Sequence, residues 1–457
     1  MKTEKWIYWI IAIAILIRIP LLFLNPITMW TDPSFRYLPN TYDVLEGDFR
    51  FYTPPLLMIL NAFPTIFLDG FLLELTWKLI PFIFFILSIL VFMQILKIIE
   101  LKKESKIFLL CLFLFNVYSI LMSTSIMLEM PTLFFTLFLF YIFEKNEKAD
   151  LKLFFLIAIT TALLLYSKQT GYFILAGFFV YIFFKKMDGK QKKLILIALI
   201  LGLLLNAPWM IKNKILYDTV LEKDVSNISG ISQVIDFNAN YPNLIIEIFH
   251  LFYRIPFLNQ LNYGGFLFFL SRIYYFSFVI ISILLSWTIL IGVAKFGREY
   301  GKYILMILPV FLFVSWITFL FDKHWTVDFG RYMFSFYFLF FFFGMKYIEN
   351  LNKAYLRKFF YGVVILSCIF SVATSYAMSY EFHQKDSGIK DVGKFILDKK
   401  GEFFSNDHYT KHALIFYSGK EILPLENKIQ CGSGTLVHSN LKYEVYLKEN
   451  NYSICGG

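Results

Sequence analysis

Long apolar stretches separated by short polar ones dominate this chain. A membrane-spanning helix needs about 20 mostly apolar residues, and several stretches approach or exceed that length. Some are short, so neighbouring stretches are expected to pair as tight hairpins or to include re-entrant pieces. The pattern predicts eleven transmembrane helices, at residues 6–24, 74–96, 107–122, 130–143, 153–167, 171–184, 194–211, 274–294, 303–321, 332–348 and 359–380.

The composition agrees with this pattern. Of the 457 residues, 58% are hydrophobic, 20% aromatic and only 17% charged, and the mean hydropathy is +0.62. A soluble domain carries about 25% charged residues and has too small a core to bury so much apolar surface. These values exclude a soluble globular protein, a disordered chain and a disulfide scaffold. We therefore predict an all-α polytopic membrane protein.

The positive charge is distributed unevenly between the two sides of the predicted helices. The N-terminus and alternate linkers hold 21 Lys and Arg in 53 residues, whereas the opposite set of linkers holds 9 in 126 residues. Cytoplasmic loops are enriched in Lys and Arg, so we place the N-terminus in the cytoplasm and the C-terminus on the outer side. The plasma membrane is the expected location of the protein. The net charge of +10 is thus mainly a topology signal, and nucleic acid is not an expected partner.

The outer side also receives the long connections. Residues 1–380 are expected to form a membrane domain with outer loops at 25–70 and 211–265. Residues 381–457 alternate short helical and strand-like segments, which predicts a small extracytoplasmic α/β domain. Cys431 and Cys455 lie in this tail, where a disulfide between them is one alternative and free thiols are the other.

Ionisable side chains at the outer ends of the predicted helices are the candidates for chemistry, because a charge at membrane depth is costly. Asp32 follows the first helix, tethered by Pro33, and either acts as a general base or is a solvated loop acid. Glu129 opens the span containing "SIMLEMPTLFF" and precedes Pro131. A carboxylate also favours the positive end of a helix for purely structural reasons, so both readings stay open.

Several cations occupy the same outer side. Lys168 and Gln169 lie in the short hairpin "LLLYSKQTGYF", and a lone Lys on the Lys-poor side either binds an anion such as phosphate or snorkels to lipid headgroups. Trp209, Lys212 and Asn213 end another span and also fit an interfacial belt. Arg331 opens a span, and its guanidinium is suited to phosphate. Arg18, in the outer half of the first span, is a further candidate for holding an anionic headgroup. His324 is either a site residue or a solvated or aromatic-packed His, whereas Arg272 and Lys78 resemble snorkelling anchors.

The order of these motifs resembles the GT-C superfamily of glycosyltransferases that use lipid-phosphate sugars. It is most similar to the dolichyl-phosphate-mannose protein mannosyltransferases and their aminoarabinose-transferase relatives. The resemblance covers residues 6 to about 380. It rests on Arg18, Asp32 and the motifs "YDVLEGDFRFYTPPLL", "SIMLEMPTLFF", "LLLYSKQTGYF", "APWMIKN" and "GRYMFSFYF". In place of the Asp-Glu pair that the mannosyltransferases often carry, Asp32 is followed here by Pro33.

The resemblance implies an inverting transfer from a polyprenyl- or dolichyl-phosphate sugar to a hydroxyl on a protein, lipid or glycan. Asp32 would be the base, with Glu129 positioning the acceptor. Fixed cations would stabilise the departing lipid phosphate. The residues implied for donor phosphate are Lys168, Arg331, Lys212 and Arg18, and those implied for substrate positioning are Gln169, Trp209, Asn213, Tyr52 and Tyr332.

Two questions stay open at this level. The implied reaction requires no nucleotide, because the donor phosphate already activates the sugar, and no cofactor is certain. Asp32, Glu129 and His324 together are candidate ligands of a divalent metal. The competing class is a polytopic lipid or glycan transporter or flippase, whose polar residues should follow a path through both halves of the bilayer. The gathering of Asp32, Glu129, Lys168 and Arg331 on one side favours the enzyme.

Overall fold

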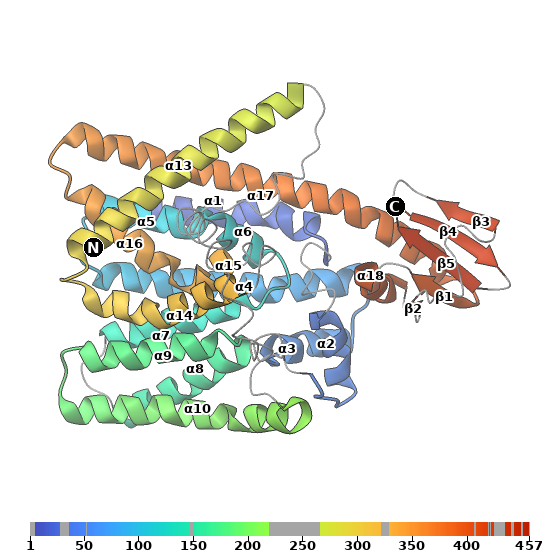
Figure 1. The fold of residues 1–457 in the computed structure, drawn as a ribbon, viewed down its shortest axis with the longest axis horizontal. Helices are drawn as coiled ribbons and strands as arrows, with labels where there is room; N and C mark the ends of the chain where they lie inside the picture. Colours follow the sequence, from blue (N-terminus) through green and yellow to red (C-terminus); the bar gives the residue numbers. More distant parts are fainter. Residues whose placement is uncertain are drawn as a thin grey trace.

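The computed structural model of the chain is shown in Figure 1. Four of the predicted features, Asp32, Tyr52, His324 and Cys431, lie outside the described residues, as does most of the 211–265 loop. The described residues are 5–27, 36–51, 53–145, 150–218, 266–320, 329–405, 408–418, 420, 422–424, 435–439, 443–448 and 451–456.

A bundle of apolar helices makes up most of the described chain. Polar residues at the turns begin several of them: the side chains of Asn116, Asp150 and Asp188 each accept a hydrogen bond from a backbone N–H in the first turn that follows. The bundle helices are α1 (Lys5–Leu24), α4 (Gly70–Ile98), α5 (Lys103–Phe115), α6 (Val117–Ser123), α7 (Glu129–Lys145), α8 (Leu151–Ser167), α9 (Gly171–Phe184), α10 (Gly189–Tyr217), α13 (Phe266–Phe296), α14 (Gly301–Leu320), α15 (Phe329–Met333), the 3-10 turn η6 (Phe334–Phe336), α16 (Tyr337–Glu349) and α17 (Ala354–Leu397).

The helices have the length and surface of an integral membrane protein. Among the described residues, α1, α4, α10 and the Ala354–Tyr380 part of α17 are each long and apolar enough to cross a bilayer. α5 and α6, bent by 47° at their junction, count as a fifth span if taken together. Large apolar side chains point outward, with Phe183 63% and Leu204 60% exposed. Lipid, not water, is the solvent that suits such a surface.

Aromatic rings fill the interior of the bundle. Phe92 of α4 stacks on Phe113 of α5 with ring centroids 4.1 Å apart, and Phe143 of α7 packs edge-on against Phe178 of α9 at 5.3 Å. Where α9 meets α14 the backbones approach so closely that a Cβ on Gly177 would collide with the Met306 carbonyl. The high Phe content therefore serves two surfaces, the packed interior and the lipid-facing exterior.

The tail forms the expected small α/β domain. Its five-stranded sheet has the order β2-β1-β5-β4-β3 and contains β1 (Glu402–Ser405), β2 (Ile422–Pro424), β3 (Thr435–Ser439), β4 (Tyr443–Lys448) and β5 (Asn451–Gly456). β1 pairs in parallel with β2 and β5, whereas β4 pairs antiparallel with β3 and β5. The domain also contains the helix α18 (His408–Ser418), which lies between β1 and β2 in the chain. Cys455 of β5 is disulfide-bonded.

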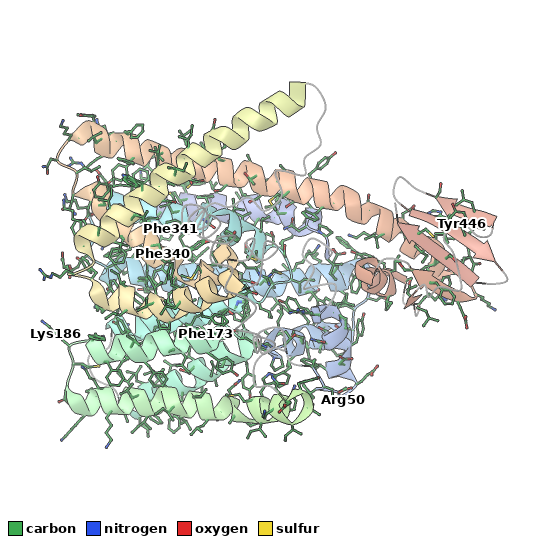
Figure 2. The ribbon with its side chains drawn as sticks, viewed as in Figure 1. Arg50, Phe173, Lys186, Phe340, Phe341 and Tyr446 are labelled. Atoms are coloured by element: carbon green, nitrogen blue, oxygen red, sulfur yellow. The ribbon has the colours of Figure 1, made fainter. Side chains whose placement is uncertain are left out.

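The sheet lies at one end of the bundle, and α17 runs from the bundle into it as one continuous helix (Figure 1). The predicted boundary at residue 380 falls inside this helix. The predicted first outer loop, residues 25–70, contributes α2 (Leu38–Leu45) and α3 (Leu56–Thr65), which lie at the same end as the sheet, opposite the N-terminus. Figure 2 shows Arg50 of this loop and Lys186 of the Lys-rich linkers at opposite ends of the bundle.

Candidate functional site

Three helix ends meet at a buried charged cluster, which we define as Glu129, Lys168 and Arg331. Glu129 is the first residue of α7, where its carboxylate sits at the positive end of the helix. Lys168 caps the C-terminus of α8 in an extended conformation. The chain then reverses into α9, and a Cβ on Gly171 would stand only 2.8 Å from the Leu164 carbonyl oxygen. Arg331 comes from the short helix α15.

The carboxylate of Glu129 binds both cations through one oxygen. Lys168 Nζ lies 2.6 Å from Glu129 Oε1, and Arg331 Nε donates to the same atom. All three side chains are buried, with exposed fractions of 2% for Glu129, 8% for Arg331 and 10% for Lys168. Buried charges are tolerated when they are paired, so the cluster is stable only as a unit. Two cations and one carboxylate leave it with a net charge of +1.

Neighbouring groups fix the orientation of the cluster. The ammonium of Lys168 lies 4.5 Å from the centre of the Tyr332 ring, a favourable cation–π distance. The adjacent hydroxyl groups of Ser167 and Thr132 are 3.0 Å apart, which ties the end of α8 to the start of α7. The other carboxylate oxygen of Glu129, Oε2, is buried and, within the described part of the chain, accepts no hydrogen bond. Buried polar atoms are normally hydrogen-bonded, so this oxygen is expected to accept a hydrogen bond from a bound group.

The end of α10 holds the first outer loop. Lys212 Nζ donates to the carbonyl oxygens of Phe49 at 3.0 Å and Phe51 at 2.5 Å, and it lies 3.4 Å from the centre of the Trp209 ring. The Phe51 ring packs on Trp209 with centroids 5.5 Å apart. Asn213 is buried beside them, and its Oδ1 accepts no hydrogen bond from the residues that the structure describes. Lys212 therefore anchors the loop through backbone oxygens.

Arg18 is enclosed in the packing between α1 and the α5–α6 region. Its guanidinium donates to Ser123 Oγ at 2.8 Å, Ser119 Oγ at 3.1 Å and two backbone carbonyl oxygens. The ring of Phe85 lies 3.9 Å away. The fully buried guanidinium thus has oxygen partners and an aromatic partner within the bundle. Its predicted contact with a donor phosphate stays a prediction.

The predicted residues are therefore placed in three ways. The structure brings Glu129, Lys168, Arg331 and Tyr332 together, with the half-buried Gln169 in the adjoining turn. Trp209, Lys212 and Asn213 form a second group against the first outer loop. Of the remaining site predictions, Arg18 lies apart from both groups, between α1 and the α5–α6 region, and Asp32, Tyr52 and His324 lie outside the described residues.

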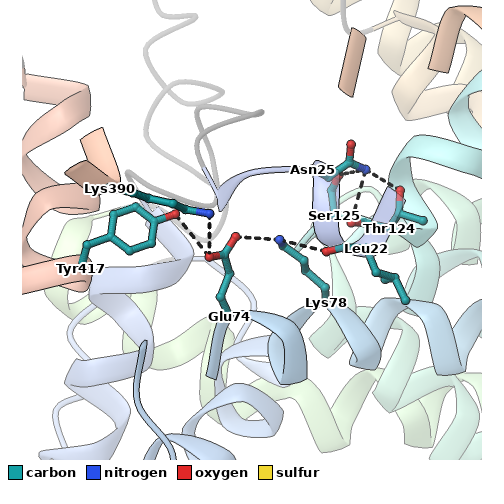
Figure 3. A network of polar contacts seen from close by, with 8 residues as sticks. All are labelled: Leu22, Asn25, Glu74, Lys78, Thr124, Ser125, Lys390 and Tyr417. Carbon is teal, nitrogen blue, oxygen red and sulfur yellow. Dashed lines mark hydrogen bonds and ion pairs between the residues drawn. The ribbon is translucent and has the colours of Figure 1, made fainter. Parts of the chain in front are cut away.

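One polar network was not foreseen from the sequence. Glu74 and Lys78, one turn apart on α4, form a buried ion pair at 2.6 Å, and Glu74 also binds Lys390 of α17 (Figure 3). The interpretation of Lys78 as a lipid-snorkelling cation was wrong, because its side chain is 3% exposed and paired. The i,i+4 spacing of opposite charges was the available signal.

Metal ligation finds no support among the residues that the structure describes. Within them, no group of three or more His, Cys, Asp and Glu side chains has the arrangement of a metal site. Of the predicted ligand set, only Glu129 belongs to the described part of the chain.

Comparison with known proteins identifies the fold. No protein-family model and no curated protein matches the sequence. The crystal structure of ArnT from Cupriavidus metallidurans bound to undecaprenyl phosphate matches with a TM-score of 0.59 at 12% identity, covering 93% of this chain and 87% of that chain. The apo structure of the same ArnT matches with a TM-score of 0.56 at 12% identity, over 92% and 85% of the two chains. The predicted resemblance to aminoarabinose transferases is confirmed at the level of the fold.

Proposed function

We propose that this chain is an inverting glycosyltransferase that moves a sugar from a polyprenyl-phosphate donor to a hydroxyl acceptor at the outer face of the membrane. The observation that carries the proposal is the buried cluster of Glu129, Lys168 and Arg331. It supplies a net positive charge at helix ends, within a fold shared with a protein whose crystal structure holds undecaprenyl phosphate.

The proposed topology places this cluster beside the outer leaflet. Eleven spans, with a cytoplasmic N-terminus and an extracytoplasmic tail, put the first residue of α7 and the α8–α9 turn on the outer side. A polyprenyl donor would keep its chain in the bilayer while its phosphate reaches the cations. A negatively charged headgroup would join Lys168 and Arg331, which already share the carboxylate of Glu129. An arginine fork and a lysine point charge are both suited to phosphate oxygens.

The reaction itself needs a base and a stabilised leaving group. The acceptor oxygen attacks the anomeric carbon, the bond from that carbon to the phosphate oxygen breaks, and the configuration inverts. We assign proton removal to Asp32, a role that typically contributes about 10²–10⁴-fold to rate. We assign stabilisation of the departing phosphate to Lys168 and Arg331, because losing one such preorganised stabiliser costs about 3–4 kcal/mol in comparable sites.

Glu129 has two roles in this proposal. Its Oε1 holds the two cations in place, and its unpartnered Oε2 is available to accept a hydrogen bond from a sugar or acceptor hydroxyl. Lys212, Trp209 and Asn213 would position the substrate through the first outer loop that they hold. A hydroxyl bound at Oε2 would satisfy a buried acceptor that is otherwise unpaired.

Donor turnover by the purified full-length protein tests the proposal. The protein is incubated in detergent with a panel of polyprenyl-phosphate sugars and a mixture of hydroxyl acceptors, and released polyprenyl phosphate is measured by mass spectrometry. We expect release with at least one donor, and its loss in Asp32→Asn without loss of donor binding. A matched control is Glu46→Gln, an exposed acid of the same loop.

The same protein in sealed vesicles separates the competing function. Movement of the donor headgroup across the bilayer, without any release of polyprenyl phosphate, would overturn the transferase and support a flippase. Near-normal transfer by Asp32→Asn would remove that residue from the mechanism.

A further inference from the structure

The outer end of α4 carries a charged joint that connects the membrane helices to the tail domain (Figure 3). We call Glu74, Lys78 and Lys390, with Tyr417, the α4 joint. Glu74 Oε1 lies 2.6 Å from Lys78 Nζ, whereas Oε2 lies 3.2 Å from Lys390 Nζ of α17. The hydroxyl of Tyr417 on α18 donates to the same Oε2 at 3.4 Å. One carboxylate thus binds its own helix and two elements of the tail.

Burial of its charged groups restricts how the tail can dock at the α4 joint. The side chains of Glu74 and Lys78 are 2% and 3% exposed, and Lys390 is 25% exposed. A carboxylate taken out of water needs its partners in place, so the tail has one well-defined docking position. Trp77, one residue before Lys78, packs on Phe416 of α18 with ring centroids 5.5 Å apart. The apolar contact and the ionic contact therefore enforce the same placement of α18.

From the joint, hydrogen bonds lead toward the first outer loop. Lys78 Nζ also donates to the carbonyl oxygen of Leu22, at the outer end of α1, at 3.2 Å. Trp77 Nε1 donates to the carbonyl oxygen of Asn61 in α3 at 2.9 Å. α1 ends just before the first outer loop, and α3 lies in the later part of that loop. The residues before the loop and the later part of the loop are therefore both bonded to α4, through Lys78 and Trp77.

A second set of bonds leads from the end of α1 to the charged cluster. Asn25, three residues after Leu22, donates through Nδ2 to Thr124 Oγ1 at 2.5 Å and to Ser125 Oγ at 3.4 Å (Figure 3). Glu129 follows Ser125 by four residues in the chain and opens α7. The segment that delivers Glu129 to the cluster is thus bonded to the segment that leaves the joint.

We propose that the α4 joint makes the tail domain a positioning element of the active site, with Glu74 and Lys390 as positioning residues. Docking of the tail through Lys390 fixes Glu74, and through Lys78 and Leu22 it fixes the end of α1 and the segment before Glu129. The proposal rests on the proposed transferase function. It assigns to the tail a role in the rate of transfer, and no role in recognising the lipid phosphate.

The test uses Lys390→Met in the full-length protein, because this partly exposed partner can be removed with little risk to the fold. The matched control is Lys394→Met, an exposed residue one turn further along the same helix. Lys390→Arg, which keeps the charge, is the rescue variant. We expect Lys390→Met to lower kcat about tenfold, since small misplacements of reacting groups reduce rates by one to two orders of magnitude.

Two further measurements distinguish positioning from general damage. Binding of undecaprenyl phosphate and KM for the donor should change less than twofold in Lys390→Met, and Lys390→Arg should restore kcat to within about threefold of wild type. Amide hydrogen exchange should accelerate in residues 56–65 and 117–125 of Lys390→Met, and not in Lys394→Met. Equal kcat and equal exchange in the two Met variants would overturn the proposal.

Failure of the proposed function gives a different result. If the wild-type protein releases no polyprenyl phosphate from any donor, the proposed transferase function is refuted. The exchange experiment still tests whether the α4 joint connects the tail to the first outer loop. Unchanged exchange in residues 56–65 and 117–125 of Lys390→Met would then refute the connection between the tail and the outer loop.

Discussion

Replacing Glu129 with Gln is the sharpest perturbation of the charged cluster. The substitution keeps the shape of the side chain and removes its charge, which takes away the carboxylate that pairs with the buried ammonium of Lys168 and the buried guanidinium of Arg331. At the 2.6 Å separation of Lys168 Nζ from Glu129 Oε1, one charge pair contributes about 6 kcal/mol of attraction at an effective dielectric of about 20. Desolvation offsets most of this in the intact protein.

Removing one partner loses the attraction and keeps the desolvation of the others. Such changes in buried pairs cost about 3–5 kcal/mol, so we expect Glu129→Gln to lower the thermal unfolding temperature in detergent by several degrees. Undecaprenyl phosphate should then stabilise the variant more than it stabilises the wild type. The reason is that the variant cluster has a net charge of +2 in place of +1, and a bound anion would replace the missing carboxylate.

The assay is thermal unfolding of the purified protein with and without undecaprenyl phosphate, and the control is Glu46→Gln, an exposed acid. Glu46→Gln should unfold like the wild type. If Glu129→Gln unfolds within one degree of this control, the carboxylate does not compensate the two cations. If it is destabilised but the lipid phosphate stabilises it no more than wild type, the cluster is structural and does not bind the donor phosphate.

Three other substitutions have expected outcomes. Lys168→Met should lower the transfer rate about 10²–10³-fold, measured by released polyprenyl phosphate, whereas the exposed Lys214→Met should not change it. Arg18→Met should lower the free energy of unfolding by about 3 kcal/mol because it removes four buried hydrogen bonds, to Ser119, Ser123 and two carbonyl oxygens; an unchanged unfolding temperature would contradict this. Cys455→Ser should destabilise the tail by about 2–4 kcal/mol because it removes a disulfide, so limited proteolysis should cut the tail faster in the variant than in the wild type. Equal proteolysis of the two proteins would show that the disulfide does not stabilise the tail.

The hydrophobic pattern predicted the helical membrane architecture because it reports a local property of each segment. An apolar stretch of the right length forms a helix in lipid whatever its neighbours are, so α4 and α10 appear where the sequence places apolar runs. The mixed sheet of the tail was also foreseen as an α/β domain, although not its order β2-β1-β5-β4-β3. The extension of α17 to Leu397 was missed, since polar residues that follow a span also form helix when a domain packs against them.

The sequence by itself determined which residues are chemically unusual. An isolated Glu129, Lys168 or Arg331 at a span end is conspicuous because charge is costly near lipid, and the structure brings these three together. Tertiary structure alone decided their partners. It showed that Arg18 is enclosed by oxygens from α1 and the α5–α6 region, that Lys212 holds the backbone of the first outer loop, and that Glu74 joins the tail to α4. Pairing depends on distances between segments that are hundreds of residues apart, and no local pattern encodes such distances.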